Sequence, residues 1–189
     1  MGQAASQTTH NRGRMKTLTL LRHAKSDWDD PALRDFDRPL NTKGARAAVT
    51  MGRHMRALGL TFDHILASPA ARVEQTLAQV ASGYGAALTP EWDRRIYLAP
   101  ASTLLELIQA LPADAEHVLL VGHNPGLEEL VLLLVPECPL RDEVEIKFPT
   151  ATLAEIGIAE EWADVAPGSG SLLRFVRPRD LDPALGPDS

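Results

Sequence analysis

Apolar residues along this chain follow two spacings, which predict strands and helices in alternation. Residues 117–121 form a continuous apolar run, a pattern typical of a strand that is buried on both faces of a parallel sheet. Apolar or small residues recur at helical spacing in residues 42–58, 70–82 and 102–111 and from Gly126 onward. Further strands are expected at residues 16–21, 64–67, 151–158 and 171–176.

This alternation predicts a three-layer α/β/α sandwich with a mostly parallel central sheet. A chain of 189 residues fits one domain, which we place at residues 15–177. Residues 1–14 are polar and are expected to be a disordered leader. Residues 178–189 are rich in proline and aspartate, and we expect a loose tail there.

Composition and charge exclude several classes of protein. The hydrophobic fraction of 44% and the charged fraction of 23% are typical of a globular domain. A net charge of -6 argues against a nucleic-acid partner, because such binding needs an excess of positive charge. No apolar run is long enough for a bilayer, so we expect no membrane partner and a cytoplasmic location. The single cysteine, Cys138, excludes an intramolecular disulfide.

Candidate chemistry gathers where predicted strands end. Arg22 and His23 directly follow the first strand, and His123 follows the strand at residues 117–121. Arg72 lies in the first turn of the helix that comes after another strand. Taken singly, each residue has an ordinary structural explanation, such as a solvated charge or a turn. Because ligands of parallel sheets bind at the carboxyl ends of the strands, we expect these residues to share one crevice.

These residue types suit the chemistry of a phosphoryl group. Two guanidinium groups offer forked, permanently charged donors to its oxygens. A neutral histidine among such cations has a lowered pKa and can act as a nucleophile. We predict this role for His23, with one ring nitrogen held in its protonated form by a backbone carbonyl. His123 is then expected to stabilise charge on the phosphoryl oxygens.

Five sequence blocks occur in order between residues 15 and 154: LLRHAKSDW, DFDRPLNTKG, ASPAARVEQT, VGHNPGLEEL and KFPTA. Together they resemble the histidine phosphatase superfamily, which has a phosphoglycerate mutase-like fold, and within it the SixA-type phosphohistidine phosphatases. The resemblance implies that His23 is transiently phosphorylated, while Arg22, Arg72 and His123 line the phosphate pocket. It also implies catalysis without a metal or other cofactor. Ala24, where most members carry glycine, favours the SixA-type branch.

A proton donor is not evident at the position where many members of that superfamily supply a glutamate. Glu91 and Asp93 are near that position, and the loop after His23 contains Asp27, Asp29, Asp35 and Asp37. The imidazole of phosphohistidine leaves as a neutral group once its ring is protonated, so a phosphoramidate needs a dedicated acid less than an ester does. Ser26 and Asp29 follow the nucleophile closely and are further candidates for contact with phosphate or substrate.

The sequence therefore predicts a metal-independent phosphatase that works through phosphorylated His23. A phosphorylated protein carrying phosphohistidine is the favoured substrate. Two alternatives remain open: a phosphatase for a small phosphorylated substrate, specifically a phosphomonoester, and a non-catalytic phosphate-binding module.

Overall fold

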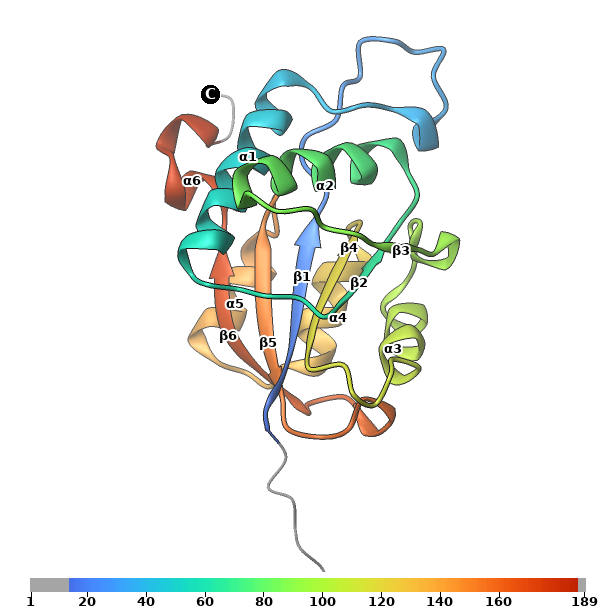
Figure 1. Cartoon of the computed structure of the whole chain (residues 1–189), viewed down its shortest axis with the longest axis vertical. Coiled ribbons are helices and arrows are strands. Elements are labelled where there is room, and N and C mark those ends of the chain that lie inside the picture. Colours follow the sequence, from blue (N-terminus) through green and yellow to red (C-terminus); the bar gives the residue numbers. More distant parts are fainter. Residues whose placement is uncertain (1–13, 187–189) are drawn as a thin grey trace, which may run out of the picture.

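A single mixed sheet forms the centre of the molecule, and its strand order is β3-β2-β4-β1-β5-β6. The computed structural model describes residues 14–186 (Figure 1). The strands β1 to β4, of which β1 is central, run parallel, whereas β5 and β6 run antiparallel to their neighbours. Their bounds are β1 Lys16–Arg22, β2 His64–Ala67, β3 Glu91–Trp92, β4 His117–Gly122, β5 Leu153–Ile158 and β6 Gly170–Val176.

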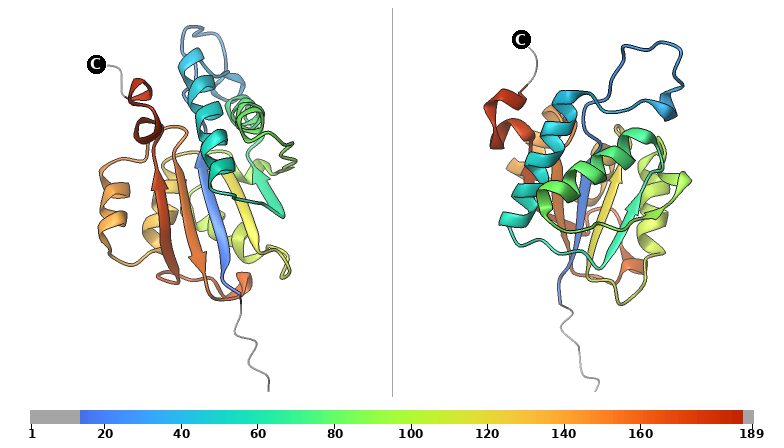
Figure 2. Two further views of the ribbon diagram at one scale, coloured as in Figure 1. Left: turned by 60° about the vertical axis from the view of Figure 1, so that its left-hand side comes forward. Right: turned by 45° about the horizontal axis from the view of Figure 1, so that its top comes forward.

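Helices cover both faces of the sheet, so the predicted three-layer α/β/α sandwich is confirmed (Figure 2). Successive residues of β1 point to opposite faces, and each face has its own apolar core. Leu21 packs with α1 and α2, while Leu18 and Leu20 pack with α3, α4 and α5. The helices are α1 Thr42–Ala57, α2 Ala71–Tyr84, α3 Ala101–Gln109, α4 Gly126–Leu134 and α5 Pro139–Ile146.

The helices α1 and α2 cross at close range because glycines face the contact. A Cβ atom on Gly52 would lie 2.1 Å from the carbonyl oxygen of Val80, and one on Gly83 would lie 2.1 Å from that of Val49. Neither space admits a side chain. The close contact matters for the site below, because α2 carries Arg72 in its first turn.

The C-terminal segment differs from the predicted loose tail. Residues Pro178–Leu181 form the short helix α6, and Pro183–Leu185 form a 3-10 turn, η4. Asp180 accepts hydrogen bonds from Arg177 and holds the start of α6. Leu185 is buried in the core beside α1, which anchors the segment up to residue 186. Its prolines and aspartates serve as helix-start and capping residues here.

One α-helix, α5, and one strand, the two-residue β3, were also not anticipated. Both are short, and α5 has one buried residue, Val144, so the apolar pattern around it is weak. The predicted leader lies outside the described residues, except for Arg14. Within residues 14–186, no helix has the length and apolar character needed to cross a membrane.

Candidate active site

Three parallel strands end side by side, and each delivers a polar side chain to the same edge of the sheet. The strand β1 ends at Arg22 and is followed by His23, β4 is followed by His123, and β2 is followed by Ser68. The backbone N–H of His23 donates to the carbonyl oxygen of Gly122 at 3.0 Å, and that of Ser68 donates to Val121 at 3.1 Å. These bonds hold the strand ends in register, so His23, His123 and Ser68 meet at one edge of the sheet.

The ring of His23 is oriented by one short hydrogen bond. Its Nδ1 atom lies 2.7 Å from the carbonyl oxygen of Ala24. A carbonyl oxygen only accepts, so Nδ1 carries the proton and the lone pair of the neutral ring is at Nε2. The Ala24 backbone is held in turn, since its N–H donates to Oγ1 of Thr76 at 2.9 Å. His23 itself is 8% exposed.

The electrostatic environment keeps His23 neutral. Burial is the main reason that its pKa is lowered from 6.5 to about 4, and the positive charges of Arg72 and Arg22 lower it further. The hydrogen bond to Ala24 and the charge of Asp35 act in the opposite direction. At neutral pH the Nε2 lone pair is therefore available for attack on an electrophile.

The second histidine, His123, lies next to His23 with a distance of 5.3 Å between the ring centroids. Its Nε2 atom is 2.7 Å from Oγ of Ser68, and its Nδ1 atom is 3.3 Å from Nη2 of Arg72. Arg72 can only donate, so Nδ1 accepts and the ring proton is on Nε2. Burial, followed by the neighbouring His23 and Arg72, lowers the pKa of His123 to about 3.

Two arginines border the two histidines from different elements. Nη1 of Arg22 donates to the carbonyl oxygen of Phe148 at 2.7 Å, while its Nε atom is buried without a hydrogen-bond partner among the described residues. Burial lowers the pKa of Arg22, yet the guanidinium stays charged. Arg72 extends to the site from the first turn of α2 and is 3% exposed. Cations this poorly hydrated attract an incoming anion strongly.

Asp35 is the hydrogen-bond and ion-pair partner of Arg72 in this structure. Its backbone carbonyl accepts from Nη1 of Arg72 at 2.7 Å, and its carboxylate accepts from Nη2 at 3.0 Å. Tyr97 donates its hydroxyl proton to the same carboxylate at 2.5 Å. Burial raises the pKa of Asp35, but the bonds from Tyr97 and Arg72 outweigh it and hold that pKa below its usual value. Asp35 is therefore an ionised partner of Arg72 at neutral pH.

The other candidate residues lie differently. Ser26 is buried and pairs through its backbone with Leu40, an isolated bridge that closes the base of the loop after β1. Asp29 is exposed on that loop, where its N–H donates to the Asp27 carboxylate at 2.9 Å. Within the described part of the chain, no hydrogen bond or ion pair links the side chain of Ser26 or Asp29 to Arg22, His23, Arg72 or His123. A contact of either residue with substrate stays a prediction.

Three contributors to the site were not among the predicted site residues. Ser68 had a usable signal, because it directly follows a strand. Asp35 is one of five aspartates in the loop after β1, and no local pattern distinguishes it from the others. Tyr97 lies 62 positions from Asp35 and has no signal in the sequence. Residues 14–186 contain no group of three or more His, Cys, Asp or Glu side chains placed to hold a metal ion.

A titration of His23 tests this electrostatic account. We expect the ring resonances of His23 in an NMR titration to move with a midpoint near pH 4, because burial and the two arginines disfavour the imidazolium. Since the unfolded chain binds this proton more readily, the free energy of unfolding should fall as the pH drops from about 6.5 to about 4. The fall attributable to His23 is about 3 kcal/mol. A midpoint near pH 6.5 would contradict this account.

Comparison with known proteins shows which family and which relatives this chain is similar to. The family model of the Histidine phosphatase superfamily (branch 1) matches residues 18–96. An uncharacterized protein of Mycobacterium tuberculosis strain H37Rv is 34% identical over 163 residues, which cover 84% of this chain and 100% of that relative. The matched family segment contains Arg22, His23, Ser68 and Arg72.

Solved structures agree with the sequence comparisons. A candidate phosphohistidine phosphatase SixA from Nakamurella multipartitia superposes with a TM-score of 0.79 at 31% identity, covering 89% of this chain and 99% of that chain. A second candidate SixA, from Agrobacterium tumefaciens, gives a TM-score of 0.75 at 31% identity, covering 88% and 100%. The similarity therefore extends over the whole length of both neighbours.

Proposed function

The chain belongs to the histidine phosphatase superfamily, and on that premise we propose that it hydrolyses protein phosphohistidine through a phosphorylated His23. The observation that carries the proposal is the bond from Nδ1 of His23 to Ala24, which leaves Nε2 unprotonated beside two arginines. The similarity to the two candidate SixA structures supports phosphohistidine as the substrate class.

In the first step, Nε2 of His23 forms a bond to phosphorus while the P–N bond of the substrate breaks. The electron pair of that bond stays on the departing imidazole, which leaves neutral because its ring is protonated beforehand. Arg22 and Arg72 bind the phosphoryl oxygens as charge redistributes in the transition state. In the second step, water adds to phosphorus and the P–Nε2 bond breaks. This releases phosphate, with one proton of the water passing to solvent, and restores neutral His23.

His123 changes its hydrogen bonds in this scheme. In the free site its Nδ1 atom accepts from Arg72, so that nitrogen has no proton to offer a phosphoryl oxygen. A bound phosphoryl dianion attracts the guanidinium of Arg72 and favours uptake of a proton from solvent at Nδ1 of His123, while Nε2 keeps its own proton. The ring then donates to the phosphoryl group while Ser68 continues to hold Nε2.

Among the described residues, the carboxyl group bonded to Arg72, that of Asp35, is ionised rather than protonated, which favours a phosphoramidate over a phosphoester. Asp35 is the carboxylate bound to Arg72, and its lowered pKa suits an ion-pair partner better than an acid. An alkoxide leaving group requires a proton in the transition state, whereas a protonated imidazole does not.

Rapid-quench labelling tests the proposed function directly. A protein carrying radiolabelled phosphohistidine is mixed with the enzyme in the presence of a chelator. We expect acid-labile label on the enzyme within the first turnover, followed by release of inorganic phosphate. Turnover of small phosphomonoesters without labelling from the phosphoprotein would move the substrate class to small molecules. Binding of phosphate without any turnover would indicate a phosphate-binding module.

Replacing Asp35 with asparagine distinguishes two roles for this residue, an ion-pair partner of Arg72 and a proton donor. The change removes the anion that competes for Arg72, so we expect inorganic phosphate to inhibit the variant at several-fold lower concentration. Turnover should stay within a few-fold of the wild type. Inhibition constants and turnover rates, measured with the same phosphohistidine peptide, check this expectation. If turnover instead fell by a factor of about 100 or more while phosphate affinity stayed unchanged, Asp35 would be identified as a proton donor.

A further inference from the structure

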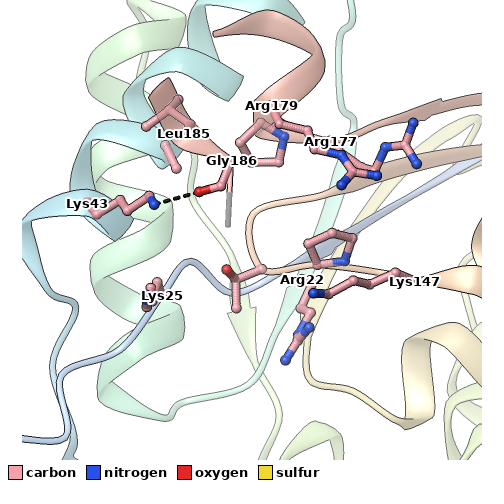
Figure 3. Close-up of a pocket in the computed structure, with 12 residues that line it drawn as sticks. Arg22, Lys25, Lys43, Lys147, Arg177, Arg179, Leu185 and Gly186 are labelled. Atoms are coloured by element: carbon pink, nitrogen blue, oxygen red, sulfur yellow. Dashed lines mark hydrogen bonds between the residues drawn. The ribbon is translucent and has the colours of Figure 1, made fainter. Parts of the chain in front are cut away.

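A cavity of about 420 Å³ opens beside the phosphate site, between the end of β1, the start of α1 and the C-terminal segment (Figure 3). Twelve residues line this basic pocket, and six of them are arginine or lysine while none is acidic. The six cationic residues are Arg22, Lys25, Lys43, Lys147, Arg177 and Arg179. Such a concentration is unexpected in a chain of net charge -6.

The basic pocket is continuous with the site through Arg22. That residue lines the pocket and directly precedes His23, and its guanidinium bonds to the carbonyl oxygen of Phe148. Figure 3 shows Lys25 and Lys43 on one side of the cavity and Lys147 and Arg179 toward the other. A ligand with its phosphoryl group at His23 therefore has cationic side chains next to it on more than one side.

Internal contacts neutralise only part of this charge. Arg177 is paired with Glu143 and with Asp180, each at 3.0 Å. Lys147 and Arg179 are exposed, and neither forms an ion pair with any residue between positions 14 and 186. Exposed cations without fixed partners are available to a ligand at little cost in broken contacts.

We propose that the basic pocket binds an acidic segment of the phosphorylated protein while its phosphohistidine occupies the site at His23. This inference rests on the proposed function. The cavity volume of about 420 Å³ is many times the volume of about 30 Å³ that one water molecule takes in the liquid. The cavity is therefore far larger than a single phosphoryl or carboxylate group. It has room for several carboxylate side chains, each able to form charge-assisted bonds with lysine or arginine.

The charge of the whole chain reinforces this selectivity. An acidic partner is repelled by most of a surface with net charge -6 and attracted at the basic pocket. Complementary charge of this kind orients an encounter and accelerates association more than it adds to affinity. The basic pocket thus selects which phosphohistidine reaches His23, because the phosphoryl group itself is the same in every protein.

Binding of an unphosphorylated peptide tests the basic pocket independently of catalysis. The probe is a fluorescein-labelled peptide with six consecutive Glu and Asp residues, compared with the same peptide carrying Gln and Asn. The test variant is Lys147→Glu with Arg179→Glu. A matched control, Arg14→Glu with Arg53→Glu, makes the same change in net charge at exposed positions outside the pocket lining.

We expect the wild type and the control to bind the acidic peptide at least tenfold more tightly than the neutral one by fluorescence anisotropy. The preference should weaken with added salt and disappear in the test variant. Equal binding of the two peptides by the wild type, or an undiminished preference in the test variant, would overturn the proposal. Binding of citrate or inorganic phosphate without binding of the acidic peptide would overturn it too, and would assign the pocket to small anions.

Kinetics then connect the basic pocket to the substrate. For phosphohistidine peptides with acidic or neutral flanks, we expect kcat/KM to favour the acidic flanks about tenfold in the wild type. The ratio should fall to near one in the test variant, with the rate on the neutral peptide unchanged. Hydrolysis of both peptides at equal rates by the wild type would overturn the inference and leave the function intact. Hydrolysis of neither would refute the function, and the binding experiment would still decide on the pocket.

Discussion

The His23→Ala variant is expected to form no phosphoenzyme and to lose turnover by a factor of about 10⁴ or more. The substitution removes the one side chain whose unprotonated nitrogen, Nε2, is set by a bond to a backbone carbonyl and lies beside two arginines. His123 does not replace it, because Ser68 holds its Nε2 atom and its Nδ1 atom is bonded to Arg72 in the free site and carries a proton once the phosphoryl group is bound.

Rapid-quench labelling with a phosphohistidine protein measures this effect. The matched control is His64→Ala, which removes a histidine that faces Glu91 at 3.7 Å rather than the site. The control should label and turn over within a few-fold of the wild type. Retention of more than a tenth of the activity in His23→Ala would contradict the assignment of the nucleophile.

The second large effect is expected at Arg72. Replacement with alanine should lower kcat/KM by about 10³-fold, because a preorganised cation facing the phosphoryl oxygens is lost from a buried site. Replacement with lysine should recover little of this loss. A single ammonium group cannot make the two parallel bonds of the guanidinium, which in this structure reach the carbonyl and the carboxylate of Asp35.

Steady-state kinetics and inhibition by inorganic phosphate check this prediction together. Weaker inhibition by phosphate in both Arg72 variants is expected, since the same side chain binds ground state and transition state. Arg53→Ala, at an exposed position of α1, is the control and should leave both measurements unchanged. Full activity in Arg72→Lys would show that charge alone suffices and that the forked geometry is not used.

The residues that follow strand ends could be predicted to lie together, because the apolar pattern of the sequence locates the strands and parallel strands end at one edge of a sheet. Buried parallel strands have a continuous apolar run, and the residue after each run lies at one common edge. Arg22, His23 and His123 are adjacent to such runs, so their meeting needed no knowledge of side-chain contacts. Arg72 was predictable for a related reason, because a helix that follows a strand starts at the same edge.

The roles of Asp35 and Tyr97 could not be predicted in this way. Five aspartates lie in the loop after β1, and the choice of Asp35 as partner of Arg72 depends on how that loop folds over α2. Tyr97 reaches the same carboxylate from the end of a 3-10 turn on the far side of the site. Long-range loop contacts depend on packing among many residues, which periodicity does not encode.

By itself, the sequence determined the layered fold, the edge of the sheet that carries the candidate site and four residues gathered there, because hydrophobic spacing and strand direction are local properties. The sequence also predicted a neutral His23 held by a backbone carbonyl, and the tertiary structure decided that this carbonyl is that of Ala24 and that burial is the main cause of the lowered pKa. Burial lowers the pKa of His23 and His123, and Asp35 restrains Arg72. It also decided the basic pocket, whose cations come from positions 22 to 179 and meet only once α6 has packed beside α1.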